Sequence, residues 1–314
     1  MIQTVALRSN RAYGGRIPPA PVGHLLTVVP KVVRGCVSMA YQRRSKSLGT
    51  PSSWLVAASD VRVVEVKADH DTIVRFDAPP LGEAAKELYT QGELWSTRPD
   101  PEDTAFDLLG DVLKDVSSEN EDSERFDQDL LRSLAAFKQV LNGSYHEMLV
   151  SGGRYSVDAP AVMDKATIAA AKTLCEKTPA QTRVRLVGVL DAVRISTQTF
   201  ALKLDDGHEV QGVFGQGDFD GVLELLKAKQ RVLVRGDASY RPSGQLLLID
   251  AEEVSAGEGQ SPIWSRVPQA AEGRLNRPSL HRRQTKSSGL AAIVGKWPGH
   301  ETDEEIAEAL RALR

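Results

Sequence analysis

The chain has 314 residues, a formal net charge of −3, 41% hydrophobic residues and 26% charged residues. This composition is typical of a soluble globular protein long enough for two domains, and it excludes disordered and fibrous classes. The two cysteines, Cys36 and Cys175, lack the spacing of a disulfide framework or a zinc site. No apolar run approaches the roughly eighteen residues of a membrane span and no secretion signal opens the chain, so we expect a cytoplasmic protein without membrane contact.

The charge is distributed unevenly along the chain. No acidic residue precedes Asp60, whereas eight Lys and Arg do, and residues 60–130 then carry 20 acidic residues against 7 basic ones. The acidic block can neutralise the basic region within the fold. Alternatively, the basic region binds the phosphate groups of nucleic acid.

The first 179 residues divide into two predicted parts. Residues 1–20 are predicted as a basic arm, because Gly14, Gly15 and the prolines at 18, 19 and 21 interrupt regular structure. Residues 21–179 are predicted as an α+β domain. Their hydrophobic periods predict a helix over 21–41 kinked at Pro30, a β-hairpin over 61–76, helices near 81–91, 104–117 and 123–142, a strand over 145–150 and a helix over 160–177.

Residues 180–254 change to the two-residue period of β-strands. Three short strands, one helix and two further strands follow each other, with turn residues at 205–208 and 241–244. This order resembles a small five-stranded OB-like β-barrel. The predicted fold class is therefore α+β, with an N-terminal α+β domain followed by a barrel.

OB-like barrels often bind single-stranded nucleic acid, and strand alternation places several arginines on the outer face of this one. Exposed charges also keep barrels soluble, so both interpretations stay open. The candidate nucleic-acid-binding residues are Arg183, Arg185, Arg194, Arg231, Arg235 and Arg241 of the barrel, with Arg43 and Arg44 of the basic region.

Catalytic signals are weak. The six histidines show no metal-binding spacing. Asp107, Asp111 and Asp115 follow each other at one-turn spacing, which suits a solvated helix face better than a cation site. Glycine turns at 151–154 and 215–217 can cradle phosphate but complete no nucleotide-binding motif. We therefore expect a protein that is not an enzyme and holds no cofactor or metal.

The last sixty residues are predicted as a linker over 255–288, rich in Gly, Ser and Pro, and a docking tail over 289–314. Thr302 and Glu305 form a capping-box pattern that predicts a helix start. Ile306, Ala309, Leu310 and Leu313 then form one apolar stripe. A helix this short gains its stability by docking, either on its own protein or on a partner.

The segment from Gly295 to Ile306 resembles the C-terminal end of antitoxins that neutralise PIN-domain ribonuclease toxins. The resemblance implies a regulatory protein whose tail binds a toxin, with Trp297, Ile306 and Leu310 as anchors and Arg311 or Arg314 near the toxin's carboxylates. Leu313 completes the apolar stripe. The sequence thus predicts an antitoxin-like binding protein. The alternative is a nucleic-acid-binding protein that uses the barrel and the basic arm.

Overall fold

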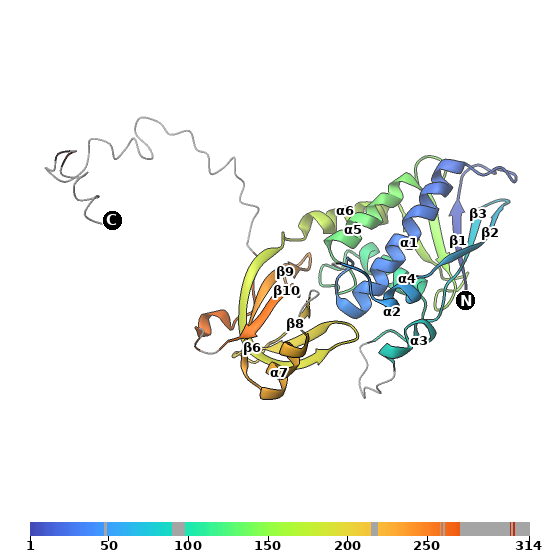
Figure 1. The fold of residues 1–314 in the computed structure, drawn as a ribbon. Coiled ribbons are helices and arrows are strands. Elements are labelled where there is room, and N and C mark those ends of the chain that lie inside the picture. Colours follow the sequence, from blue (N-terminus) through green and yellow to red (C-terminus); the bar gives the residue numbers. More distant parts are fainter. Residues whose placement is uncertain are drawn as a thin grey trace. The chain divides into compact units, whose positions relative to one another are not determined.

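A computed structural model describes residues 1–46, 49–89, 98–214, 219–257, 259, 261–270, 302 and 304. Two folds follow each other along the chain (Figure 1): a sheet with helices over residues 1–177, called the α+β part below, and a β-barrel over residues 182–256. The predicted α+β class and the predicted barrel are both confirmed at this level.

The α+β part contains a five-stranded antiparallel sheet in the order β2-β3-β1-β4-β5. Its strands are β1 (Ile2–Arg8), β2 (Arg62–Ala68), β3 (Thr72–Asp77), β4 (Glu147–Ser151) and β5 (Ala161–Asp164). Strand β1 lies in the middle of the sheet, so the predicted basic arm is wrong for residues 2–8. Val5 and Leu7 alternate with less buried neighbours and are fully buried, which is the two-residue period of a strand.

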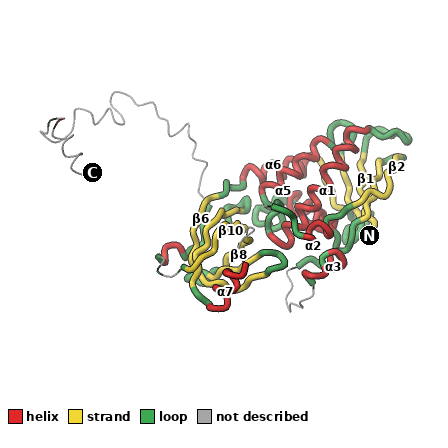
Figure 2. Tube along the Cα trace, viewed as in Figure 1, coloured by secondary structure: helices red, strands yellow, loops and turns green. Residues whose placement is uncertain are grey.

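Helices cover one face of this sheet, as Figure 2 shows. They are α1 (Pro19–Gln42), α2 (Ser53–Ala58), α3 (Leu81–Ala84), α4 (Ala105–Ser117), α5 (Gln128–Ala135) and α6 (Lys165–Lys177), with 3-10 turns at Lys86–Leu88 and Ala136–Gln139. The covered face buries Val5, Val74 and Met148. On the other face Arg75 and Val162 are exposed.

Most predicted elements of this part are found, with differences at their ends. The hairpin is β2 and β3, and helix α1 runs through Pro30. The helix predicted from residue 160 begins only at Lys165, because Asp164 ends strand β5 and accepts a hydrogen bond from the Thr167 N–H at 2.8 Å. Likewise Asp127 caps α5, so the helix predicted from residue 123 begins at Gln128.

The barrel is closed and its strands lie in the order β10-β8-β7-β6-β9. They are β6 (Thr182–Arg194), β7 (Thr199–Lys203), β8 (Glu209–Phe214), β9 (Arg231–Tyr240) and β10 (Leu246–Ala256), with α7 (Phe219–Ala228) between β8 and β9. Strands β8 and β10 pair in parallel and the other neighbours are antiparallel. This arrangement is compatible with an OB-like barrel.

The barrel and the α+β part share buried residues. The barrel has its own core, which includes Leu186, Phe200 and Val232. Its outward-facing Val213, Leu247 and Leu248 are buried in the same hydrophobic cluster as the helices of the α+β part. Residues 1–270 therefore form one unit.

The predicted linker begins later than expected. Residues 261–270 lie against the barrel: Ser265 is buried and accepts a hydrogen bond from the Asp205 N–H at 2.8 Å, and Val267 packs on the barrel core. The rest of the predicted linker and nearly all of the predicted tail helix lie outside the described residues.

Among the described helices, α1 is the one whose length and hydropathy would suit a membrane span. In its most apolar window, 56% of the residues are buried inside the fold. A core helix of a soluble protein meets the same criteria of length and hydropathy, and the buried residues of α1 include Leu25, Val29 and Val33.

Candidate functional site

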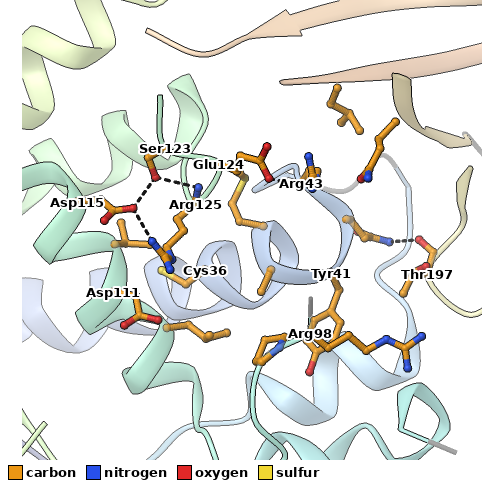
Figure 3. Close-up of a pocket in the computed structure, with 18 of the residues that line it drawn as sticks. Cys36, Tyr41, Arg43, Arg98, Asp111, Asp115, Ser123, Glu124, Arg125 and Thr197 are labelled. Atoms are coloured by element: carbon orange, nitrogen blue, oxygen red, sulfur yellow. Dashed lines mark hydrogen bonds and ion pairs between the residues drawn. The ribbon is translucent and has the colours of Figure 1, made fainter. Parts of the chain in front are cut away.

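A cavity of about 800 Å³ lies between the two folds of the 1–270 unit. Its walls come from the C-terminal half of α1, from α4 and the loop after it, from residues 98–103, and from the β6–β7 turn and strands β7, β8 and β10 of the barrel. Figure 3 shows Tyr41 and Cys36 of α1 between Asp111 and Asp115 on one side and Thr197 on the other. Cavities that bind small molecules in proteins measure roughly 300–1,000 Å³.

Helix α4 brings two carboxylates to the cavity, and each has its own partners. Asp115 accepts hydrogen bonds from the Ser123 hydroxyl at 2.6 Å and from Arg125 at 2.9 Å (Figure 3). Asp111 accepts from the Tyr155 hydroxyl at 2.7 Å and from Arg154 at 2.8 Å. The prediction of a solvated face for these aspartates is therefore wrong, since both are bound to side chains of the loop and of the β4–β5 connection.

The third aspartate of this series, Asp107, binds the glycine turn at 151–154 through its carboxylate. Its carboxylate accepts the Arg154 N–H at 2.6 Å, and a Cβ on Gly153 would lie 2.4 Å from Asp107 Oδ1. The same carboxylate closes the α4 capping box with Thr104. The turn thus binds an anion, as its glycines suggested, but that anion is an internal carboxylate instead of a phosphate.

Arg154 joins two acidic segments next to the cavity. Its guanidinium lies 2.7 Å from Asp103 and 2.8 Å from Asp111. Burial raises the pKa of Asp103 above its ordinary value, and the nearby Arg154 acts in the opposite direction. Burial, together with the hydrogen bond to Asp111, also raises the pKa of Tyr155, so this phenol stays neutral and donates a hydrogen bond to Asp111.

The barrel side of the cavity is fixed by two hydrogen bonds from the α+β part, one buried and one partly buried. The Gln42 amide donates to the Thr197 carbonyl oxygen at 3.0 Å, and the Trp54 indole N–H donates to the Ser196 carbonyl oxygen at 2.9 Å. Both acceptors belong to the β6–β7 turn. This turn is one of the two loops through which OB-like barrels usually contact their ligands.

The second such loop, between β9 and β10, is also bound to the α+β part. The Ser243 N–H donates to the Glu121 carbonyl oxygen at 3.2 Å, and Arg241 forms an ion pair with Glu124. Glu124 lies in the cavity wall and also binds Arg43, at 2.9 Å. Both loops are therefore engaged within the chain.

Most of the arginines predicted to bind nucleic acid form ion pairs with acidic residues. The pairs are Arg43 and Arg241 with Glu124, Arg44 with Asp250, Arg183 with Glu252, Arg231 with Asp205, and Arg235 with Glu253. Arg194 lies in the cavity wall, and Arg185 is exposed opposite Arg235 on β9. The structure does not bring these eight residues together as one uncompensated basic surface.

The predicted partner-binding residues lie outside the described residues. They are Trp297, Ile306, Leu310, Arg311, Leu313 and Arg314. Their binding to a toxin stays a prediction.

Sequence reasoning missed the cavity because its walls come from segments far apart in the chain. The one-turn spacing of Asp111 and Asp115 gave one signal, and two arginines predicted to bind nucleic acid, Arg43 and Arg194, also lie in the wall. Ser123, Arg125 and Thr197 belong to no motif, and their roles depend on how α4 and the barrel meet. Cys36 also lines the cavity, and burial raises the pKa of its thiol, which keeps it protonated.

Comparison with known proteins gives no relative from which a role could be transferred. No family model, curated protein or solved structure matches the chain.

Proposed function

We propose that the protein is a binding protein whose ligand, a small polar molecule, lies in the cavity between the α+β part and the barrel. The observation that carries the proposal is the cavity itself, with its volume of about 800 Å³ and walls from both folds. Its walls are held by a shared hydrophobic cluster and by hydrogen bonds across the interface, such as the one from Gln42 to Thr197. A preformed site of this kind loses little free energy to ordering when a ligand binds.

The charges of the lining indicate the chemistry of the ligand. Six carboxylates and five guanidinium groups line the cavity, so the two signs nearly balance. A polyanion would meet as many like charges as opposite ones. A ligand with both hydrogen-bond donors and acceptors, such as an amino acid, a sugar or a nucleoside, suits this lining better.

The alternative proposal, nucleic-acid binding by the barrel, has less support. The β6–β7 and β9–β10 loops, through which OB-like barrels usually contact their ligands, are hydrogen-bonded to Gln42, Trp54 and Glu121 of the same chain. At least six of the eight candidate arginines have carboxylate partners. Binding of labelled single strands that weakens steeply with salt would favour this alternative over the cavity.

Native mass spectrometry of the full chain, compared with its denatured mass, tests whether a small molecule copurifies. A thermal-shift panel of amino acids, sugars and nucleosides gives a second readout. A ligand present at a hundred times its Kd is expected to raise the Tm by roughly 5 °C. Absence of both a copurified mass and a thermal shift contradicts the proposal.

A matched pair of variants tests whether the ligand binds in the cavity. Ala40 lines the cavity, so Ala40→Phe fills part of it and should abolish the shift. Ala57 is an exposed residue of α2, and Ala57→Phe should leave the shift unchanged. Equal shifts in both variants would assign the ligand to another place on the protein.

A further inference from the structure

Strand β2 is the outer edge of the five-stranded sheet, as Figure 1 shows. Among the described residues it pairs with β3 alone, so its other side presents free backbone N–H and C=O groups. It also exposes three valines, Val63, Val64 and Val66, at 48%, 58% and 38% of their surface. An exposed apolar edge strand is a template for pairing with another strand.

The sequence of this edge is complementary to itself. Residues 60–67, which are the two residues before β2 and the first six of the strand, read Asp-Val-Arg-Val-Val-Glu-Val-Lys. When two copies run antiparallel about a two-fold axis between Val63 and Val64, Asp60 lies opposite Lys67 of the second copy and Arg62 lies opposite its Glu65. Val61 then lies opposite Val66, and Val63 opposite Val64, so every pair is either oppositely charged or apolar.

The β-bulge of β2 makes this register possible. Regular alternation would put Arg62 and Glu65 on opposite faces, but the irregularity between Val63 and Glu65 brings both to one face, opposite Asp77 and Arg75 of β3. Lys67 lies on that face as well, and Asp60 is bonded there to Arg62 at 2.6 Å. Val63 and Val66 share the other face. Opposed residues in an antiparallel pair must share a face, and this register satisfies that rule for Arg62 and Glu65.

The neighbouring registers lose this complementarity. Sliding the second copy by one residue places Arg62 opposite a valine. Sliding it by two places Arg62 opposite Lys67 or Asp60 opposite Glu65, and like charges directly opposite each other destabilise a sheet. The register centred between Val63 and Val64 is therefore preferred over those within two residues of it, and it places all four charged residues opposite an opposite charge.

We propose that β2 is a homodimer interface, at which two copies of this chain join their sheets edge to edge in the register that pairs Arg62 with Glu65 and Asp60 with Lys67. The partner of the edge strand is a second copy of this chain, because each charged residue of one copy lies opposite an oppositely charged residue of the other. The backbone hydrogen bonds and the valines supply the affinity, and the charges fix the register. This interface is separate from the cavity, so either proposal can fail without the other.

Analytical ultracentrifugation and native mass spectrometry of the full chain test the interface. The wild type should be a dimer. The acidic variant Arg62→Glu/Lys67→Glu makes all four charged pairs repulsive and should raise the dimer dissociation constant at least about a hundredfold. The basic variant Asp60→Lys/Glu65→Lys should do the same, and mixing the two variants should restore a dimer of mixed composition.

A control with the same change in net charge as the acidic variant is Lys172→Glu/Lys203→Glu, which alters exposed residues of α6 and β7 and should leave the dimer intact. Circular dichroism checks that each variant is folded. A monomeric wild type overturns the proposal without any variant. Dimers that persist in both charge variants overturn it too, because they would use another surface.

Discussion

The guanidinium of Arg44 and the carboxylate of Asp250 form a partly buried ion pair at 3.1 Å that links the residues just after α1 to strand β10 of the barrel. The side chain of Arg44 is only 8% exposed and that of Asp250 23%. Burial raises the pKa of Asp250, and Arg44 opposes this shift. The two folds are thus joined by a charge pair next to the hydrophobic cluster that they share.

Removing Arg44 should destabilise the protein, because the Asp250 carboxylate stays mostly out of water and loses its ion-pair partner. We expect Arg44→Leu to lower the free energy of unfolding by about 3 kcal/mol. Urea denaturation at neutral pH measures the loss. The double variant Arg44→Leu/Asp250→Leu should recover much of it, since two apolar groups need no partner. A double variant less stable than the single one would contradict this account.

The contact between Gly153 and Asp107 gives a second prediction. Gly153 has φ +53°, and an added Cβ would lie 2.4 Å from Asp107 Oδ1. Gly153→Ala should therefore cost both backbone strain and a displaced carboxylate, together about 3 kcal/mol. Gly14 has nearly the same φ, +55°, with no atom within 4 Å of the added Cβ, so Gly14→Ala should cost about 1 kcal/mol. Equal losses in the two variants would show that the carboxylate moves freely.

A third prediction concerns pH. Hydrogen bonds from the Thr167 N–H and hydroxyl lower the pKa of Asp164, the N-cap of α6, below its ordinary value. The charged cap therefore stabilises the fold above about pH 4, the value in the unfolded chain, and this contribution is lost as the pH falls through the lower pKa of the folded state.

Asp164→Ser keeps an oxygen that can cap the helix but removes the titratable carboxyl group. We expect the Tm difference between wild type and variant to be constant at neutral pH and to change in favour of the variant as the pH falls below about 4. Thermal unfolding followed by circular dichroism at several pH values measures this. Asp164→Ala, which removes the cap, should cost about 1 kcal/mol at neutral pH.

The barrel could be predicted from sequence because its signals are local. The two-residue period and the turn residues of 182–256 identify each strand without knowledge of its neighbours. Strand β1 was missed because Ile2–Arg8 gains its stability from β3 and β4, whose residues lie more than sixty positions away in the chain. The cavity could not be predicted for the same reason. Thr197 and Asp115 line one cavity only because the two folds share a core.

The last prediction tests the hydrogen bond that fixes the barrel wall of the cavity. Gln42 is 4% exposed, and its amide donates to the Thr197 carbonyl oxygen while accepting from the Ser38 hydroxyl. Gln42→Leu leaves a buried carbonyl without a donor, which costs about 1–3 kcal/mol. Without the hydrogen bond from Gln42, we expect the β6–β7 turn to open more often. The Phe214 N–H reports on this opening, because it donates to the Gln198 carbonyl oxygen of the turn at 2.8 Å.

Hydrogen exchange of the Phe214 amide should therefore become roughly ten to a hundred times faster in Gln42→Leu, while amides of β1 and β3 keep their wild-type rates. Ser38→Ala is the control, because it removes only the 3.3 Å bond to Gln42 and leaves the Thr197 contact in place. It should leave the Phe214 exchange rate near that of the wild type. If both variants accelerate exchange equally across the sheet and the barrel, Gln42 stabilises the whole fold and does not hold the turn in particular.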